Sequence, residues 1–241
     1  MIDVLAIGTH PDDLELSCGA TLAKLVHQGH SVACADLTQG ELGTRGTKEI
    51  RAREAQKAAD ILGIKERRNL QIPDGNVEKN QTNVKKVIAL IRELMPRVLL
   101  IPHSFDRHPD HIQTHHVCRE AWFYSGLAKI PTQHEGEDQP PHRPDIWFEF
   151  MQWHEFTPSF IVDVTETWET KMSAVRAYES QFHNPKSREP ETKLSNPGFL
   201  ELVETRGRSY GEKIGTRYGE PFLCPAALGV KDLFDFVLLK G

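Results

Sequence analysis

The sequence predicts an α/β fold of the Rossmann-like type, with a mostly parallel sheet and helices on both of its faces. Short apolar runs, typical of buried parallel strands, alternate with amphipathic helical stretches. Strands and helices that alternate in this way, joined by right-handed crossovers, give such a sheet. The expected strand order is 3-2-1-4-5, with additional strands from the second half of the chain. At 241 residues the chain is long enough for one sizeable domain.

Residues 1–130 are expected to form the Rossmann-like core. Four strands are predicted in it from apolar runs bounded by polar residues, at 2–9, 31–37, 67–72 and 97–102. Four helices are predicted from the spacing of apolar side chains and, for the first three, from the glycine or proline that ends them, at 14–28, 47–62, 80–95 and from about 111 onward. A glycine-rich loop fills residues 38–46.

Residues 131–241 are expected to extend this core within the same domain and to complete the sheet and the substrate pocket. The elements predicted there are a polar, proline-rich loop, two strands and a helix, at 131–144, 146–154, 159–164 and 166–181. The segment 183–198 carries several prolines and many charges, so we expect a mobile surface loop.

The composition excludes several classes of protein. The formal net charge is −5 and no basic stripe of a nucleic-acid-binding motif occurs, so no nucleic-acid partner is expected. No apolar run approaches the roughly 20 residues that span a bilayer, and no basic segment precedes the first strand as in a signal peptide, so no membrane partner is expected. The four cysteines are scattered, which favours reduced, buried thiols and a cytoplasmic location.

Two histidine–aspartate motifs follow the first and the fourth predicted strands. His10-Pro11-Asp12-Asp13 comes at the end of the first strand, and His108-Pro109-Asp110-His111 comes after the fourth. In a sheet of order 3-2-1-4-5 these strands are neighbours, and ligands bind in the crevice between their carboxyl ends. The fold therefore brings the two motifs together, although they lie far apart in the sequence.

Three of these side chains have a spacing that fits a divalent metal ion. His10 and Asp13 can converge on one ion across the strand-to-helix turn, and His111 can supply a third ligand from the neighbouring loop. Two imidazoles and one carboxylate, with a further position open to water, are typical of a catalytic zinc site. One Zn²⁺ per chain is therefore expected, although the same ligands accept Fe²⁺ or another divalent metal.

The polar neighbours of these ligands can supply proton transfer. Asp12 stands beside two expected ligands and is placed to take a proton from water. His108 can donate to a developing oxyanion or protonate a leaving amine, and Asp110 can orient and charge an imidazole. The pattern predicts metal-assisted hydrolysis.

Other interpretations account for fewer of these residues. An acidic pair alone also suits a solvated helix N-terminus. Such a pair occurs in phospho-acceptor signalling modules too, with Asp74 as the apparent acceptor, but a module of that kind leaves the histidines unexplained. A dinucleotide-binding domain needs G-x-G-x-x-G in its first turn, and residues 8–13 lack the second and third glycines.

The sequence resembles the LmbE/PIG-L family of zinc-dependent N-acetylglucosamine deacetylases. The resemblance rests on the two histidine–aspartate motifs and continues over most of the chain, at 38–44, 51–54, 73–75, 177–182 and 210–220. It implies the same roles: zinc ligation by His10, Asp13 and His111, a general base at Asp12, and an oxyanion stabiliser or acid at His108 with Asp110 as its orienting partner. The last segments most resemble the bacillithiol-pathway branch, which implies N-acetylglucosaminyl-malate as substrate.

The resemblance also implies which residues hold the substrate. Arg51, Arg107 and Arg143 are the expected arginines, with Glu41 accepting from a sugar hydroxyl, because the fork of arginine suits the two carboxylates of malate. The alternative for each arginine is a surface position or an ion pair, such as one between Arg51 and Glu54. A different N-acylated sugar or amide stays open as the substrate. Relatives of this kind often assemble, so a homo-oligomer is expected.

The sequence departs from some relatives at one position. Where they carry a mobile tyrosine near the active site, this chain has Phe199, which cannot donate to an oxyanion. His108 is then expected to carry that role with less help. Tyr178, Tyr210 and Tyr218 are expected to pack in the core or at an interface.

Overall fold

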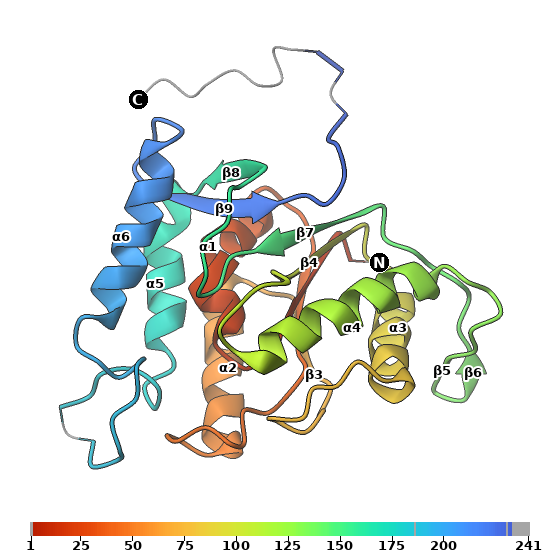
Figure 1. The fold of residues 1–241 in the computed structure, drawn as a ribbon, viewed down its shortest axis with the longest axis horizontal. Coiled ribbons are helices and arrows are strands. Elements are labelled where there is room, and N and C mark those ends of the chain that lie inside the picture. The colour runs from red at the N-terminus through yellow and green to blue at the C-terminus, as the bar shows by residue number, and fades with distance from the viewer. Residues whose placement is uncertain (1, 186, 230, 233–241) are drawn as a thin grey trace.

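The computed structural model describes residues 2–185, 187–229 and 231–232, and it has the predicted α/β architecture (Figure 1). The seven-stranded sheet has the order β3-β2-β1-β4-β7-β9-β8. Its strands are β1 (Val4–Gly8), β2 (Val32–Asp36), β3 (Glu66–Asn69), β4 (Val98–Pro102), β7 (Ile146–Phe150), β8 (Phe160–Asp163) and β9 (Gly219–Leu223). The first five strands of this order pair in parallel, and β9 pairs antiparallel with β7 and β8. The predicted order is therefore confirmed, with β7 as the fifth strand.

Helices cover both faces of the sheet (Figure 1). They are α1 (Asp13–His27), α2 (Lys48–Leu62), α3 (Gln81–Leu94), α4 (Pro109–Ser125), α5 (Trp168–Arg176) and α6 (Phe199–Glu212). Alternate side chains of β1 explain why both faces need cover. Val4 and Ala6 join the core under α1, α2 and α5, whereas Leu5 and Ile7 join the core under α3 and α4.

The helix ends follow the local signals in the sequence. The Thr47 side chain accepts from the Ile50 N–H at the start of α2, and Asn80 caps α3 in the same way. Gly63 ends α2 with a φ of 73°, in the left-handed region that favours glycine. These caps explain why both helices begin, and α2 ends, close to the predicted bounds.

The helix predicted over 166–181 is shorter than expected. It consists of a 3-10 turn at Thr165–Thr167 followed by α5, which ends at Arg176. The N–H and Oγ of Ser180 donate to the Glu54 carboxylate at 2.7 Å each, and Gln181 donates to the carbonyl of Arg45 at 2.8 Å. The Ser180 N–H therefore bonds another part of the chain instead of a carbonyl of α5, and the Gln181 side chain ties the same segment to Arg45.

Three further elements differ from the predictions. The loop predicted at 131–144 contains a small hairpin of β5 (Gln133–His134) and β6 (Glu137–Asp138). Neither α6 nor β9 is among the predicted elements. The strand β9 has the sequence GEPFL, in which a buried glutamate and a proline hide the apolar pattern. The described residues of 183–198 form turns and bends, as expected for a loop, and their mobility stays a prediction.

A buried ionic cluster lies beneath the first turns of α1. Arg67 of β3 donates to Asp36 at 2.8 Å through two nitrogens and to Glu15 of α1 at 2.5 Å. The Tyr178 hydroxyl donates to the other oxygen of Glu15 at 3.2 Å. Since α1 begins at the first histidine–aspartate motif, this cluster stabilises the helical turn that directly follows the motif.

The cysteines are consistent with reduced thiols. Cys18, Cys34 and Cys118 are buried, Cys224 is half-buried, and none of these four described residues forms a disulfide. Burial raises the pKa of the first three thiols, so they stay protonated at neutral pH. In the part of the chain that the structure describes, no helix is both long and apolar enough to cross a bilayer.

We predict that Arg67→Met destabilises the protein by about 3–5 kcal/mol, because it leaves two buried carboxylates without their cation while keeping most of the side-chain volume. Urea unfolding at pH 7 measures this. The matched control is Arg68→Met, since Arg68 is 48% exposed in its ion pairs and such pairs contribute at most about 1 kcal/mol. Equal stabilities of the two variants would contradict the assigned role of Arg67.

Candidate active site

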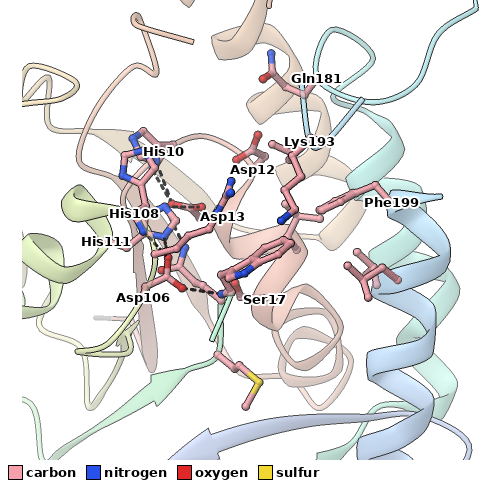
Figure 2. A pocket seen from close by; sticks show the side chains of 18 of the residues that line it. His10, Asp12, Asp13, Ser17, Asp106, His108, His111, Gln181, Lys193 and Phe199 are labelled. Atoms are coloured by element: carbon pink, nitrogen blue, oxygen red, sulfur yellow. Dashed lines mark hydrogen bonds and ion pairs between the residues drawn. The ribbon is translucent and has the colours of Figure 1, made fainter. Parts of the chain in front are cut away.

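The two histidine–aspartate motifs meet at the carboxyl ends of β1 and β4, which are neighbours in the sheet. The ring centroids of His10 and His108 are 4.8 Å apart, those of His10 and His111 are 5.4 Å apart, and those of His108 and His111 are 4.7 Å apart. Figure 2 shows the three rings together on one side of a pocket, beside Asp13. The structure thus places together the histidines that the sequence predicted to converge.

The three predicted metal ligands have their donor atoms within reach of one ion. Asp13 Oδ2 lies 3.5 Å from His10 Nδ1, and Asp13 Oδ1 lies 3.3 Å from His111 Nε2. Two donors bound to a tetrahedral zinc ion at 2.0–2.1 Å lie about 3.3 Å apart. His10, Asp13 and His111 also form a group whose ligand atoms all lie within 4.8 Å of one another. These spacings fit a divalent ion.

Two carboxylates outside the predicted set orient the imidazoles. His10 Nε2 bonds Asp74 Oδ1 at 3.0 Å, and His111 Nδ1 bonds Asp106 Oδ1 at 2.9 Å. Each ring therefore turns its other nitrogen toward Asp13, as carboxylates behind metal-bound histidines do. In the sequence, Asp74 stood out as the apparent acceptor of the alternative signalling module and as part of the segment 73–75, but not as a partner of His10, whereas Asp106 had one signal, its place two residues before His108.

The same carboxylates control the charge of both imidazoles. Burial alone would lower the pKa of His10, but Asp13 and Asp74 raise it to about 10. Against the same burial effect, Asp13 and Asp106 raise the pKa of His111 to about 9. Both rings therefore carry a proton at neutral pH when no metal is bound, and a metal ion must displace it.

Asp12 adopts a backbone conformation that is rare for any residue other than glycine. Its φ of 110° places the side chain at the start of α1, beside the ligands. Burial raises its pKa to about 7, and the nearby Arg51 guanidinium opposes that rise. Arg51 Nη2 donates to Asp12 Oδ2 at 3.1 Å and Nη1 donates to the Gly40 carbonyl at 3.2 Å. Arg51 therefore pairs with Asp12, and not with Glu54.

His108 is fixed in one tautomer by the start of α4. Its Nδ1 accepts from the Asp110 N–H at 3.2 Å, so the proton of the neutral ring is on Nε2. Burial, together with the positive charges of His10 and His111, lowers the pKa of His108. The Asp110 carboxylate accepts from the Gly75 N–H at 2.7 Å and lies 3.9 Å from His10 Nε2. It does not bond the His108 ring, which differs from the orienting role expected for it.

The four residues predicted to hold substrate separate into two groups. Arg51 and Arg107 line the pocket. Glu41 does not line it, and its carboxylate instead accepts from the main-chain N–H groups of Asp74 and Gln39. Arg143 lies elsewhere. Its guanidinium is 4.5 Å from the ring centroid of Phe123, and Phe123 itself lies about 18 Å along α4 from His111. The structure therefore does not bring Arg143 together with Arg51 and Arg107, and its contact with substrate stays a prediction.

The pocket has a volume of about 420 Å³, and its lining includes Trp153 and Lys193, which the sequence did not indicate. Lys193 lies with its ammonium 3.6 Å from the Trp153 ring centroid, and the Arg107 guanidinium lies 4.7 Å from the same centroid. Phe199 points into the pocket from α6 (Figure 2).

Tyr178, Tyr210 and Tyr218 are buried, which confirms the packing expected of them.

One family model and several known proteins resemble the chain. Residues 5–122 match the model PIG-L, described as GlcNAc-PI de-N-acetylase. The diacetylchitobiose deacetylase of Thermococcus kodakarensis is 30% identical over 227 residues, which cover 90% of this chain and 80% of that protein. A Bacillus cereus protein, probable N-acetyl-alpha-D-glucosaminyl L-malate deacetylase 2, is 25% identical over 191 residues, 74% of this chain and 83% of that protein. The solved structure of the conserved protein TT1542 from Thermus thermophilus has a TM-score of 0.85 and 36% identity, covering 96% of this chain and 98% of that one.

We predict that metal uptake at pH 7 releases about two protons per chain, because His10 and His111 have raised pKa values and each must lose a proton to bind. The apparent affinity should therefore rise as the pH increases toward 9, and fall in acid. Calorimetric titration with zinc in buffers of different ionisation enthalpy counts these protons. A proton release near zero at pH 7 would contradict the assigned ligands.

Proposed function

The chain belongs to the PIG-L family of deacetylases, and on that premise we propose that it is a zinc-dependent hydrolase that removes the acetyl group from an N-acetylglucosaminyl conjugate. The observation that carries the proposal is the placement of Asp13 between two imidazoles, with Asp12 beside them. The family is metal-dependent, and the spacing of these donors supports a single ion. An open coordination position distinguishes a catalytic site from a structural one.

The proposed ligands are His10, Asp13 and His111. Two nitrogen donors and one carboxylate suit zinc, and the orienting carboxylates Asp74 and Asp106 fit its usual surroundings. When bound, a zinc ion supplies Lewis-acid chemistry, which polarises the amide carbonyl and makes water more acidic.

Asp12 is the proposed general base. Its carboxylate stands beside the proposed ligands at the start of α1, where it can take a proton from the attacking water and later give it to the departing amine nitrogen of the sugar. The contact with Arg51 holds the carboxylate in one orientation during these transfers. The water oxygen forms a bond to the acetyl carbon, the bond between that carbon and the sugar nitrogen then breaks, and acetate and the free amino sugar are the products.

His108 is the proposed hydrogen-bond donor to the carbonyl oxygen as that oxygen gains negative charge. Its Nδ1 is occupied by the Asp110 N–H, so Nε2–H is the group free to donate. Phe199 has no donor group, which leaves His108 as the side chain proposed for this task. A donor of this kind typically contributes a factor of about 10²–10³ to the rate.

Two cations that line the pocket indicate which kind of aglycone the substrate carries. Arg107 and Lys193 gather at Trp153, and the carboxylates of a malate aglycone are suitable partners for them. We therefore place N-acetylglucosaminyl-malate first among the conjugates. The second candidate is N,N′-diacetylchitobiose, because the relative named for that substrate matches 90% of this chain.

Acetate release from three compounds tests the proposal: N-acetylglucosaminyl-malate, N,N′-diacetylchitobiose and free N-acetylglucosamine. We expect zinc-dependent release that is fastest from the malate conjugate, because both of its carboxylates can reach a cation. A preference for diacetylchitobiose would instead select the second candidate. Release of no acetate from any of the three by zinc-loaded protein would contradict the proposed function.

We predict that Asp12→Asn retains its metal but loses a factor of about 10²–10⁴ in kcat, the usual contribution of a general base. Asparagine is the suitable replacement because it tolerates a positive φ, which alanine does not. Metal analysis and steady-state kinetics measure the two properties separately. The comparison variant, His111→Ala, should lose metal and activity together, and a parental kcat in Asp12→Asn would show that the base is elsewhere.

A further inference from the structure

The pocket continues beyond the histidines into an apolar compartment. This inner compartment lies among α1, α5, α6 and β9, and its apolar lining residues are Leu16, Met151, Trp168, Leu194, Phe199 and Val203. None of the proposed metal ligands or proton-transfer residues belongs to this set. The compartment is therefore a part of the pocket that the deacetylation chemistry itself does not use.

The compartment borders the place where the pairing between β7 and β9 ends. These strands pair only at Glu149 with Leu223 and at Phe150 with Phe222. Pro221 has no N–H with which to continue the ladder, and β7 ends at Phe150. On the opposite wall, a Cβ at Gly207 of α6 would lie 2.3 Å from the Trp168 ring, so α6 approaches closely only because this residue is glycine.

The charged groups of the inner compartment already have partners. Lys171 and Glu220 are both 2% exposed and form an ion pair of 2.6 Å. Glu220 also accepts from the N–H groups of Ala20 and Thr21, at 3.2 Å and 2.7 Å, just after α1 departs from helical geometry at Cys18. These contacts satisfy the ions within the protein, so they leave no charge to attract a charged ligand.

Arg206, the other cation of this wall, is engaged as well. Its guanidinium donates to the carbonyl oxygens of Gln152 and Trp153, the residues that follow β7. The surface left for a ligand is therefore mainly apolar. A charged or strongly polar group placed there would lose its hydration without gaining a partner.

The same cavity joins the compartment to the proposed metal ligands. Asp13 and Leu16 both line it from α1, less than one helical turn apart. Figure 2 shows Phe199 entering from α6 on the side opposite the three histidines, with Lys193 between. A molecule with its amide at the histidines can therefore extend into the compartment.

We propose that the inner compartment binds an apolar alkyl or aryl group carried by the same amino-sugar substrate, either as part of the aglycone or as part of the N-acyl group. This proposal rests on the proposed deacylation of an amino sugar, but not on either polar conjugate named above. Each methylene that enters the compartment should raise kcat/KM about fourfold, the usual effect of burying one methylene, until the space is filled.

Two substrate series distinguish the sources of the apolar group. In one, N-acetylglucosamine carries methyl, butyl, hexyl or octyl as its O-alkyl group. In the other, glucosamine carries N-acetyl, N-butanoyl, N-hexanoyl or N-octanoyl. A rise in kcat/KM with chain length in the first series assigns the compartment to the aglycone, and a rise in the second assigns it to the acyl chain. Values independent of chain length in both series would overturn the proposal.

A pair of variants on α6 locates the effect. Val203→Trp fills the compartment and should remove the dependence on chain length. Thr205→Trp adds the same side chain at an exposed position outside the cavity and should keep that dependence. Circular dichroism and the unfolding midpoint show whether each variant is folded. Retention of the full dependence by a folded Val203→Trp protein would place the apolar group elsewhere and contradict the proposal.

Binding without turnover separates this proposal from the proposed function. Calorimetry on zinc-loaded Asp12→Asn protein compares the octyl with the methyl glycoside of N-acetylglucosamine, and N-octanoyl with N-acetyl glucosamine. Tighter binding of a long-chain member, by at least tenfold, supports the compartment even if the zinc-loaded parental protein releases acetate from none of the three compounds that test the proposed function, a result that would refute only that function. Equal binding within both pairs would refute the compartment, whatever the kinetics show.

Discussion

The Asp13 carboxylate is the contact on which the site depends. Its Oδ2 accepts the N–H groups of Thr9 and His10, at 3.1 Å and 2.9 Å, where β1 ends. The main chain thus fixes a carboxylate between His10 and His111, although one histidine follows β1 and the other lies in the first turn of α4. A negative charge buried in this way is stable only beside positive partners, either two imidazolium rings or a metal ion. The arrangement therefore favours cation binding before any substrate arrives.

The surroundings of Asp13 hold this geometry from two sides. Toward the pocket, Asp74 and Asp106 turn the two imidazoles so that their remaining nitrogens face the carboxylate. Behind α1, Arg67 compensates the charges of Glu15 and Asp36, so the first turn of the helix can carry acidic residues on both faces. Asp12 lies between these two sets of contacts. They hold the turn in place, so it maintains an unfavourable φ of 110° at this residue.

The sequence was most informative where one local signal determined the structure. Apolar runs predicted β1, β2 and β4, apolar spacing together with Gly63 and Pro96 predicted α2 and α3, and adjacent strand ends predicted the meeting of His10 with His111. It was less informative where contacts between distant residues determine the structure. Ser180 bonds Glu54 instead of continuing α5. The strand β9 was missed because it contains Glu220, whose charge is compensated by Lys171 far away in the sequence. The same holds in the site. Asp74 and Lys193 reach the pocket only through the fold, and Arg143 has the right residue type but lies beside Phe123 near the far end of α4.

The central claim is that one ion binds among His10, Asp13 and His111, and a crystal structure of the zinc-loaded protein tests it most directly. Anomalous diffraction measured on both sides of the zinc absorption edge locates the metal without reference to the protein atoms. We expect one peak per chain, about 2.0–2.2 Å from His10 Nδ1, an Asp13 oxygen and His111 Nε2. A fully occupied peak at any other group of residues, with none at this position, would contradict the account.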